Sequence, residues 1–156
     1  MKKLVVYYSK TGITKKVAEN ISFWLKANRE EILDEKEWRG AIGYLKAGRD
    51  AAEKKLTKIS EPEWDPADFN MVIIGTPVWA WTMTPAIRTY IEKYKDVLKE
   101  KELGFFCTMA RNGDKRAFKA MEELIGRKPR AFLSLKTKEV VQSKYETAVR
   151  EFVKKL

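Results

Sequence analysis

The apolar residues of this chain fall into short runs rich in β-branched and aromatic residues, separated by stretches in which apolar residues recur at helical spacing. The short runs predict five β-strands. The predicted strands are Leu4–Tyr8, Glu31–Leu33, Met71–Gly75, Leu103–Cys107 and Ala131–Ser134. The third run is apolar on both faces, which is typical of a strand in the middle of a parallel sheet.

Stripes of apolar residues predict five helices, one after each strand. The stripe of the second helix is interrupted by glycine and comprises Ala41, Ile42, Leu45, Ala52 and Leu56. Thr84 before Pro85 predicts the start of the third helix, and Gly126 predicts the end of the fourth. Ser143 lies three residues before Glu146, the spacing of a capping box for the last helix.

The alternation of strands and helices predicts a three-layer α/β sandwich, in which a parallel sheet has helices on both faces. Five strands with right-handed crossovers give the strand order 2-1-3-4-5. The chain has 156 residues and no repeat, so we expect a single domain over residues 1–156. Such sheets bind ligands beyond the carboxyl ends of their strands. We therefore expect the site in the loops after the first, third and fourth strands.

The loop after the first strand combines three hydroxyl residues with a glycine where a helix begins. It comprises Ser9, Lys10, Thr11, Gly12, Ile13 and Thr14. A helix N-terminus has unpaired N–H groups and partial positive charge, so it binds a phosphate without a cationic side chain. Gly12 lets the backbone approach the anion or adopt a positive φ, and we expect Lys10 to face solvent. The alternative is that the hydroxyls only cap the helix, for which one would suffice.

The sequence contains neither G-x-x-x-x-G-K-[ST] nor G-x-G-x-x-G, the motifs of other phosphate-binding folds. S-K-T-G-I-T instead resembles the phosphate loop of the flavodoxin family, [ST]-x-T-G-x-T. The family's second flavin loop is similar to Thr76, Pro77, Val78, Trp79, Ala80 and Trp81. Its third flavin loop corresponds to Thr108, Met109, Ala110, Arg111, Asn112 and Gly113. The resemblance covers essentially the whole chain and implies a flavodoxin-like fold with FMN as the cofactor.

The resemblance also implies a role for each loop. The FMN phosphate would be bound by Ser9, Thr11, Gly12, Ile13 and Thr14. Thr76–Trp79 would flank the isoalloxazine ring, and Thr108–Gly113 would meet its pyrimidine edge. Both indoles of the second loop offer a flat surface for the ring. The family position favours Trp79, whereas Trp81 could equally pack in the core or in a dimer contact.

One departure from the family concerns the residues beside Trp79. Electron-carrying flavodoxins tend to have glycine there, and a peptide flip then stabilises the one-electron-reduced flavin, but here the neighbours are Val78 and Ala80. A positive φ costs about 1–2 kcal/mol at a non-glycine residue. We interpret the chain as an FMN-binding electron-transfer protein. The alternatives are an NAD(P)H-dependent quinone or flavin reductase of the same fold, and a cofactor-free basic binding module.

The formal net charge of +10 is a second departure, because electron-carrying flavodoxins are commonly acidic. The densest stretch, Arg111 to Arg130, has seven basic and three acidic residues and begins in the third loop. Such a field could attract an acidic redox protein, hold the phosphates of NADPH or attract nucleic acid. We expect an acidic protein partner or a small-molecule electron acceptor. Nucleic acid is disfavoured because no recognition motif accompanies the charge.

The remaining composition excludes several kinds of chemistry. Without histidine the chain cannot form a Ser-His-Asp triad or a histidine metal site, and the single Cys107 cannot form an internal disulfide. We expect Cys107 to be a small buried residue. No apolar run approaches the ~18 residues of a membrane span, and no signal peptide is recognisable, so we expect a cytoplasmic protein. Abundant Lys and Glu with one glutamine, Gln142, is the bias of hyperthermophile proteins.

Overall fold

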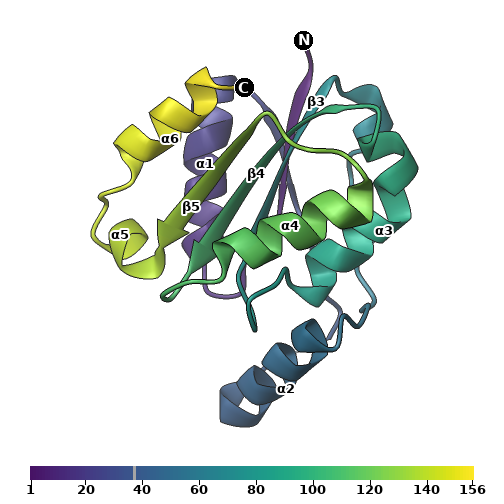
Figure 1. Cartoon of the computed structure of the whole chain (residues 1–156), viewed down its shortest axis with the longest axis vertical. Helices are drawn as coiled ribbons and strands as arrows, with labels where there is room; N and C mark the ends of the chain where they lie inside the picture. Colours follow the sequence, from purple (N-terminus) through teal and green to yellow (C-terminus); the bar gives the residue numbers. More distant parts are fainter. Residues whose placement is uncertain (37) are drawn as a thin grey trace.

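The computed structural model describes residues 1–36 and 38–156. Its five strands form one parallel sheet in the order β2-β1-β3-β4-β5, as the sequence predicts. The strands are β1 (Lys3–Tyr7), β2 (Asn28–Glu31), β3 (Met71–Pro77), β4 (Glu102–Met109) and β5 (Ala131–Lys136). Helices lie on both faces of the sheet, which confirms the three-layer sandwich (Figure 1).

The helices divide into two layers and one separate element. They are α1 (Ile13–Leu25), α2 (Gly40–Ala52), α3 (Pro85–Leu98), α4 (Asp114–Ile125), α5 (Thr137–Val141) and α6 (Glu146–Lys154), with a short 3-10 helix η1 (Pro66–Asp68). Helices α1, α5 and α6 pack on one face of the sheet, and α3 and α4 cover the other (Figure 1). Helix α2 lies apart from both layers, at the end of the sheet toward which the strands point (Figure 1).

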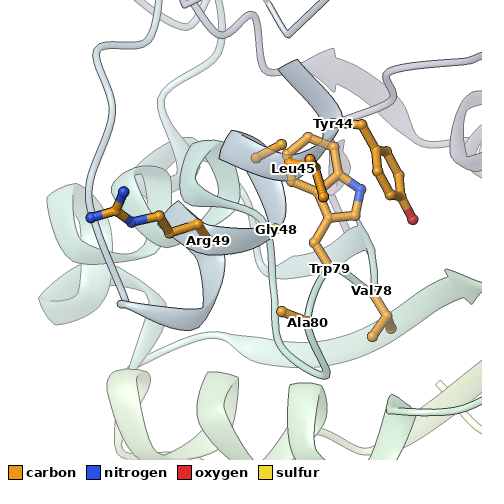
Figure 2. A pocket seen from close by; sticks show the side chains of 8 residues that line it. Tyr44, Leu45, Gly48, Arg49, Val78, Trp79 and Ala80 are labelled. Carbon is orange, nitrogen blue, oxygen red and sulfur yellow. The ribbon is translucent and has the colours of Figure 1, made fainter. Parts of the chain in front are cut away.

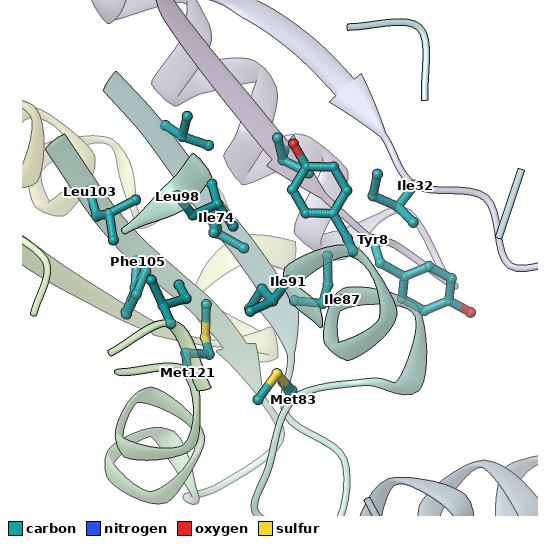
Figure 3. Packing of buried hydrophobic residues seen from close by; sticks show 14 of the residues in the cluster. Tyr8, Ile32, Ile74, Met83, Ile87, Ile91, Leu98, Leu103, Phe105 and Met121 are labelled. Atoms are coloured by element: carbon teal, nitrogen blue, oxygen red, sulfur yellow. The ribbon is translucent and has the colours of Figure 1, made fainter. Parts of the chain in front are cut away.

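Each face of the sheet has its own hydrophobic core, because successive side chains of a strand point to opposite faces. Val6 of β1 belongs to the core under α3 and α4, whereas Val5 belongs to the core under α1 and α6. Figure 3 shows the first of these cores, in which Ile87 of α3 is fully buried. In β3, a β-carbon at Gly75 would lie 1.9 Å from the Phe106 ring. That position therefore requires glycine.

The second strand begins earlier than the sequence predicts. The predicted strand is Glu31–Leu33, but β2 is Asn28–Glu31 and pairs with β1 as far as Glu31 opposite Tyr7. β2 is a polar strand at the edge of the sheet. Apolar patterning therefore detects Ile32, a buried residue just beyond the strand, and misses the strand itself.

Two predictions about the C-terminal helices are wrong. The described residues contain a sixth short helix, α5, which starts where the Glu139 carboxylate accepts the backbone N–H of Lys136 at 2.6 Å. The predicted capping box does not form, because α6 begins at Glu146 with Tyr145 as its N-cap and no side-chain cap hydrogen bond. Ser143 instead has a φ of 55° in the turn after α5.

The predicted ends of α3 and α4 are confirmed. The Thr84 hydroxyl oxygen accepts the backbone N–H of Ile87 at 3.4 Å, and Pro85 is the first residue of α3. Helix α4 ends at Gly126, whose φ is 77°. No helix among the described residues is both long and apolar enough to cross a membrane.

The apolar stripe predicted for the second helix is wrong, because all five of its residues are exposed and Leu56 lies beyond the end of α2. Ile42 and Leu45 are each 71% exposed, whereas the small residues Gly43 and Ala47 face inward. A β-carbon at Gly43 would lie 2.8 Å from the main chain of Trp38, so glycine permits this close approach. The buried face of α2 therefore consists of small residues four positions apart, and its large apolar residues do not face the protein interior.

Candidate functional site

The loops after β1, β3 and β4 meet at the carboxyl edge of the sheet. The hydroxyls of Thr14 and Thr108 share a hydrogen bond of 2.8 Å, and both side chains are buried. The backbone N–H of Val78 donates to the carbonyl oxygen of Thr108 at 2.8 Å. The indole N–H of Trp81 donates to Oδ1 of Asn112 at 3.0 Å. The structure thus brings together the three loops that the sequence singles out.

Ser9 organises the loop between β1 and α1. Its hydroxyl oxygen accepts the backbone N–H groups of Gly12 at 3.1 Å and Lys15 at 3.2 Å. Gly12 has a φ of 88°, and nothing lies within 4 Å of the position its β-carbon would take. Lys10 is exposed, as predicted, with its ammonium 5.8 Å from the centre of the Tyr44 ring.

The start of α1 presents backbone donors. Within residues 1–36 and 38–156, the N–H groups of Thr11, Ile13 and Thr14 have no hydrogen-bond acceptor. The first turn of α1 contains no acidic residue, so the partial positive charge of its N-terminus is not compensated locally. These three residues border a cleft. The arrangement suits an anion such as a phosphate.

Residues 79–82 form a tight turn after β3. The N–H groups of Trp79 and Thr82 each donate to the other's carbonyl oxygen, at 3.0 and 3.1 Å. The two central residues, Ala80 and Trp81, have φ values of 48° and 61°. Each costs about 1–2 kcal/mol relative to an ordinary conformation. A loop without glycine is expected to avoid positive φ values, but this loop has two of them. The paired hydrogen bonds between Trp79 and Thr82 stabilise this conformation.

The two tryptophans of this turn have different surroundings. The ring of Trp79 is partly buried and packs edge-on against Tyr8 at 5.6 Å and Trp38 at 6.1 Å. Trp81 is 53% exposed, so it is not a core residue. Its Cα would lie 3.0 Å from a β-carbon on Gly113, whose φ is 107°. Trp79, which borders the cleft, is the better placed of the two to contact a ring bound there.

A layer of polar and aromatic side chains supports Trp79. Asp34 accepts the indole N–H of Trp38 at 3.0 Å and the hydroxyl of Thr57 at 2.7 Å. Burial raises the pKa of the Tyr8 phenol well above its ordinary value, and the negative charge of Asp34 raises it further. Sequence reasoning missed these residues because they come from separate segments that only the fold brings together.

The cleft collects predicted residues from all three loops. Its lining includes Lys10, Thr11, Ile13, Thr14, Pro77, Val78, Trp79, Thr108, Met109 and Ala110. Two further lining residues, Tyr44 of α2 and Thr137 of α5, were not predicted. The Thr137 hydroxyl donates to the carbonyl oxygen of Met109 at 3.2 Å. No local motif marks either residue, since each belongs to a helix whose position depends on tertiary packing.

Several predicted residues lie outside the lining of the cleft. Thr76 is fully buried, and its hydroxyl donates to the carbonyl oxygen of Pro77 and accepts the N–H of Thr84. It therefore supports the start of α3. Arg111 and Asn112 are exposed beside the cleft. Cys107 is fully buried, as predicted, and burial raises the pKa of its thiol to about 12.

Helix α2 adds a second cavity around Trp79 (Figure 2). This cavity has a volume of about 320 Å³ and shares Tyr44, Val78 and Trp79 with the cleft. In Figure 2, Tyr44 and Leu45 lie beside the indole of Trp79, whereas the guanidinium of Arg49 points away from it. The cleft and this cavity therefore adjoin one another, and cavities of this size suit parts of a small ligand.

Comparison with known proteins identifies the family. No curated protein sequence matches the chain. A flavoprotein from Lactobacillus acidophilus, described in complex with FMN, is 24% identical with a TM-score of 0.73 over 90% of this chain and 97% of its own. The flavodoxin, WrbA-like protein from Agrobacterium tumefaciens is 17% identical with a TM-score of 0.61 over 98% and 93%. A Streptococcus pneumoniae flavodoxin is 11% identical with a TM-score of 0.57 over the whole of both chains.

These structural likenesses establish the fold. A family model described as the flavodoxin domain matches residues 44–156, which include the second and third loops of the site. The match spans more than half of the sequence. The chain therefore belongs to the flavodoxin domain family.

Proposed function

We propose that the chain binds one FMN non-covalently and transfers electrons between redox partners. The observation that carries this proposal is the cleft, whose lining combines the unpaired N–H groups at the start of α1 with Trp79. Membership of the flavodoxin domain family supports the same cofactor. So does the neighbour from Lactobacillus acidophilus, which is described as a complex with FMN.

The residues present fit a phosphate monoester. The N–H groups of Thr11, Ile13 and Thr14 would donate to its oxygens, and the open space beside Gly12 leaves room for them. The hydroxyl of Ser9 already accepts two backbone N–H groups, so its main contribution would be to fix the shape of the loop. Donors held in place before the ligand arrives cost less ordering entropy on binding.

The residues also fit a flat ring. Val78 and Trp79 would flank it, and the backbone of the third loop would meet its edge. Tyr8 and Trp38 hold the indole of Trp79 in one orientation. When bound, FMN would supply the redox chemistry, because the chain has no histidine and its only cysteine is buried. The part of the protein is binding, orientation and electrostatics.

The charge of the exposed rim supports an acidic protein partner. Arg111, Lys115 and Arg116 are exposed beside the third loop, and none of the three side chains forms an ion pair among the described residues. A positive rim steers a negatively charged protein toward the cofactor and speeds its association at low ionic strength. Raising the salt concentration should therefore slow electron transfer from such a partner.

An NAD(P)H-dependent quinone or flavin reductase is the second candidate. The observation that favours it is a further cavity beside Trp81, whose size suits a small molecule. Anaerobic mixing of the FMN-loaded protein with NADH or NADPH separates the candidates. Rapid unaided bleaching of the flavin absorbance supports the reductase, and bleaching that needs a partner protein supports the electron carrier. A purified protein that rejects added FMN would contradict both.

A further inference from the structure

The cavity beside Trp81 lies between the end of α2, the 79–82 turn and α4. It has a volume of about 470 Å³ and includes Ala80, Trp81 and Thr82 in its lining. Ala80 also lines the cavity under α2, so both cavities border the 79–82 turn. Small-molecule sites typically enclose about 300–1,000 Å³. The cavity is therefore large enough for a ligand of its own next to the proposed flavin site.

Basic side chains dominate the polar lining of this cavity. Lys54, Arg116 and Lys119 come from two separate parts of the chain, and Glu123 is their only acidic neighbour in the lining. Glu123 lies 3.8 Å from Lys119, and both side chains are exposed, so this pair is weak. Within the described residues, neither Lys54 nor Arg116 forms an ion pair with a carboxylate. The cavity therefore has a surplus of positive charge.

A buried arginine behind the lining of the cavity adds to this positive charge. Arg88 of α3 is only 7% exposed, and its guanidinium donates to the hydroxyl of Thr82, a lining residue, at 3.2 Å. Its Nε has no hydrogen-bond partner, and no carboxylate lies within 4 Å among the described residues. The charge of Glu92 favours the guanidinium only from a longer distance, and a buried cation without a direct ion pair is costly. A negative charge placed above Thr82 would offset that cost.

The wall of the cavity carries a fixed aromatic surface. Trp81 is half exposed, but its indole N–H is bonded to Asn112, and its backbone is held in the left-handed region. The absence of a β-carbon at Gly113 allows the third loop to pack against it. A strained, rigid and half-exposed indole is more typical of a ligand contact than of a core residue.

We propose that this cavity binds a planar aromatic molecule with two or more negative charges, as the second substrate of the flavin site. The ring would lie against Trp81, and the anionic groups would face Lys54, Arg116 and Lys119, with Arg88 beneath. The proposal rests on the proposed function, because the ligand would be either a reductant that gives a hydride to oxidised FMN or an oxidant that takes a hydride equivalent from reduced FMN. In each case one of the two is oxidised as the other is reduced. A concave cavity with an indole wall suits a small molecule, whereas an acidic protein would meet the exposed rim outside it.

The test is isothermal titration calorimetry on FMN-loaded protein with three probes. Anthraquinone disulfonate and NADP⁺ are aromatic polyanions, and naphthoquinone is an uncharged planar control. We expect at least one polyanion to bind, and the one that binds shows whether sulfonate-like or phosphate groups are preferred. We expect naphthoquinone to bind at least about tenfold more weakly than that polyanion, because it lacks the charges that meet the basic side chains.

Matched charge reversals identify the place of binding. Arg116→Glu combined with Lys119→Glu should weaken the polyanion about tenfold or more. Lys128→Glu combined with Lys144→Glu changes the net charge equally at exposed positions outside the lining, and should change affinity less than about threefold. Trp81→Ala, as a single substitution, should also weaken binding of the polyanion relative to the wild-type protein. The dependence of this affinity on salt concentration should stay unchanged, because no charge is removed.

The outcomes separate this inference from the proposed function. If FMN binds to every variant alike but neither polyanion binds, or both double variants lose affinity equally, the cavity proposal is wrong and the flavin site stands. If FMN itself does not bind, the proposed function fails, and the probes are then titrated against the chain alone. Loss of the polyanion in the cavity variant only, with FMN affinity intact, supports the proposal.

Discussion

The substitution Gly12→Ala tests the phosphate loop with little disturbance elsewhere. Gly12 has a φ of 88° and open space around the missing β-carbon, so alanine meets no steric clash within the protein. The cost to folding is then the left-handed conformation alone, about 1–2 kcal/mol. For a chain of this length each kcal/mol lowers the melting temperature by about 2–4 °C. The added methyl group would, however, stand in the space that the phosphate needs.

Gly126→Ala is the matched control. Gly126 also has a positive φ, 77°, and also has nothing within 4 Å of its absent β-carbon, but it ends α4 at the opposite edge of the sheet. Both variants should lose similar stability. Only Gly12→Ala should lose FMN affinity, because the methyl group would keep the phosphate away from a neighbouring N–H donor. The loss of one hydrogen bond to a charged group corresponds to about a tenfold to hundredfold weaker affinity.

Fluorescence titration with FMN and thermal unfolding of the two variants give both quantities. FMN affinity that stays at the wild-type value in Gly12→Ala would refute the assignment of the phosphate to this loop. A parallel loss of affinity in both would show that the effect is global and has no connection with the loop.

Three further predictions concern the packing around the site. Thr14→Val should cost about 1–3 kcal/mol of unfolding free energy in urea titrations, because it strips the buried hydroxyl of Thr108 of its partner; the double variant with Thr108→Val should recover part of that loss. Gly75→Ala should destabilise the fold by about 1–3 kcal/mol or more, since its β-carbon would enter the Phe106 ring, and an unchanged melting curve would refute this. The raised pKa of Cys107, about 12, keeps the thiol protonated at neutral and mildly alkaline pH, so alkylation should require unfolding, and fast labelling of the native protein would contradict its burial.

The strand order and the three loops could be predicted because their signals are local. A buried strand such as β3 is a continuous apolar run, and the hydroxyl-rich turn before α1 is a short motif. β2 could not be located from hydrophobicity, because an edge strand can be polar. The contributions of Tyr44 and Trp38 to the site depend on where α2 and its preceding segment come to lie, and no nearby residue encodes that position.

The basic cavity had only a partial signal in the sequence. The dense positive stretch from Arg111 is visible there, but its convergence with Lys54 from the end of α2 requires the fold. Arg88 gives no signal at all, because an arginine on an amphipathic helix is ordinarily exposed. Its burial next to Thr82 is a property of the tertiary structure.

The central claim is that the loop at the start of α1 holds the phosphate of FMN, and paired titrations with FMN and riboflavin test it most directly. The two ligands share the same ring, and riboflavin lacks only the phosphate. The unpaired N–H groups of Thr11, Ile13 and Thr14 predict that FMN binds at least about a hundredfold more tightly, as expected for two or more hydrogen bonds to a charged group. Equal affinity for the two ligands, or no binding of FMN, would contradict the account.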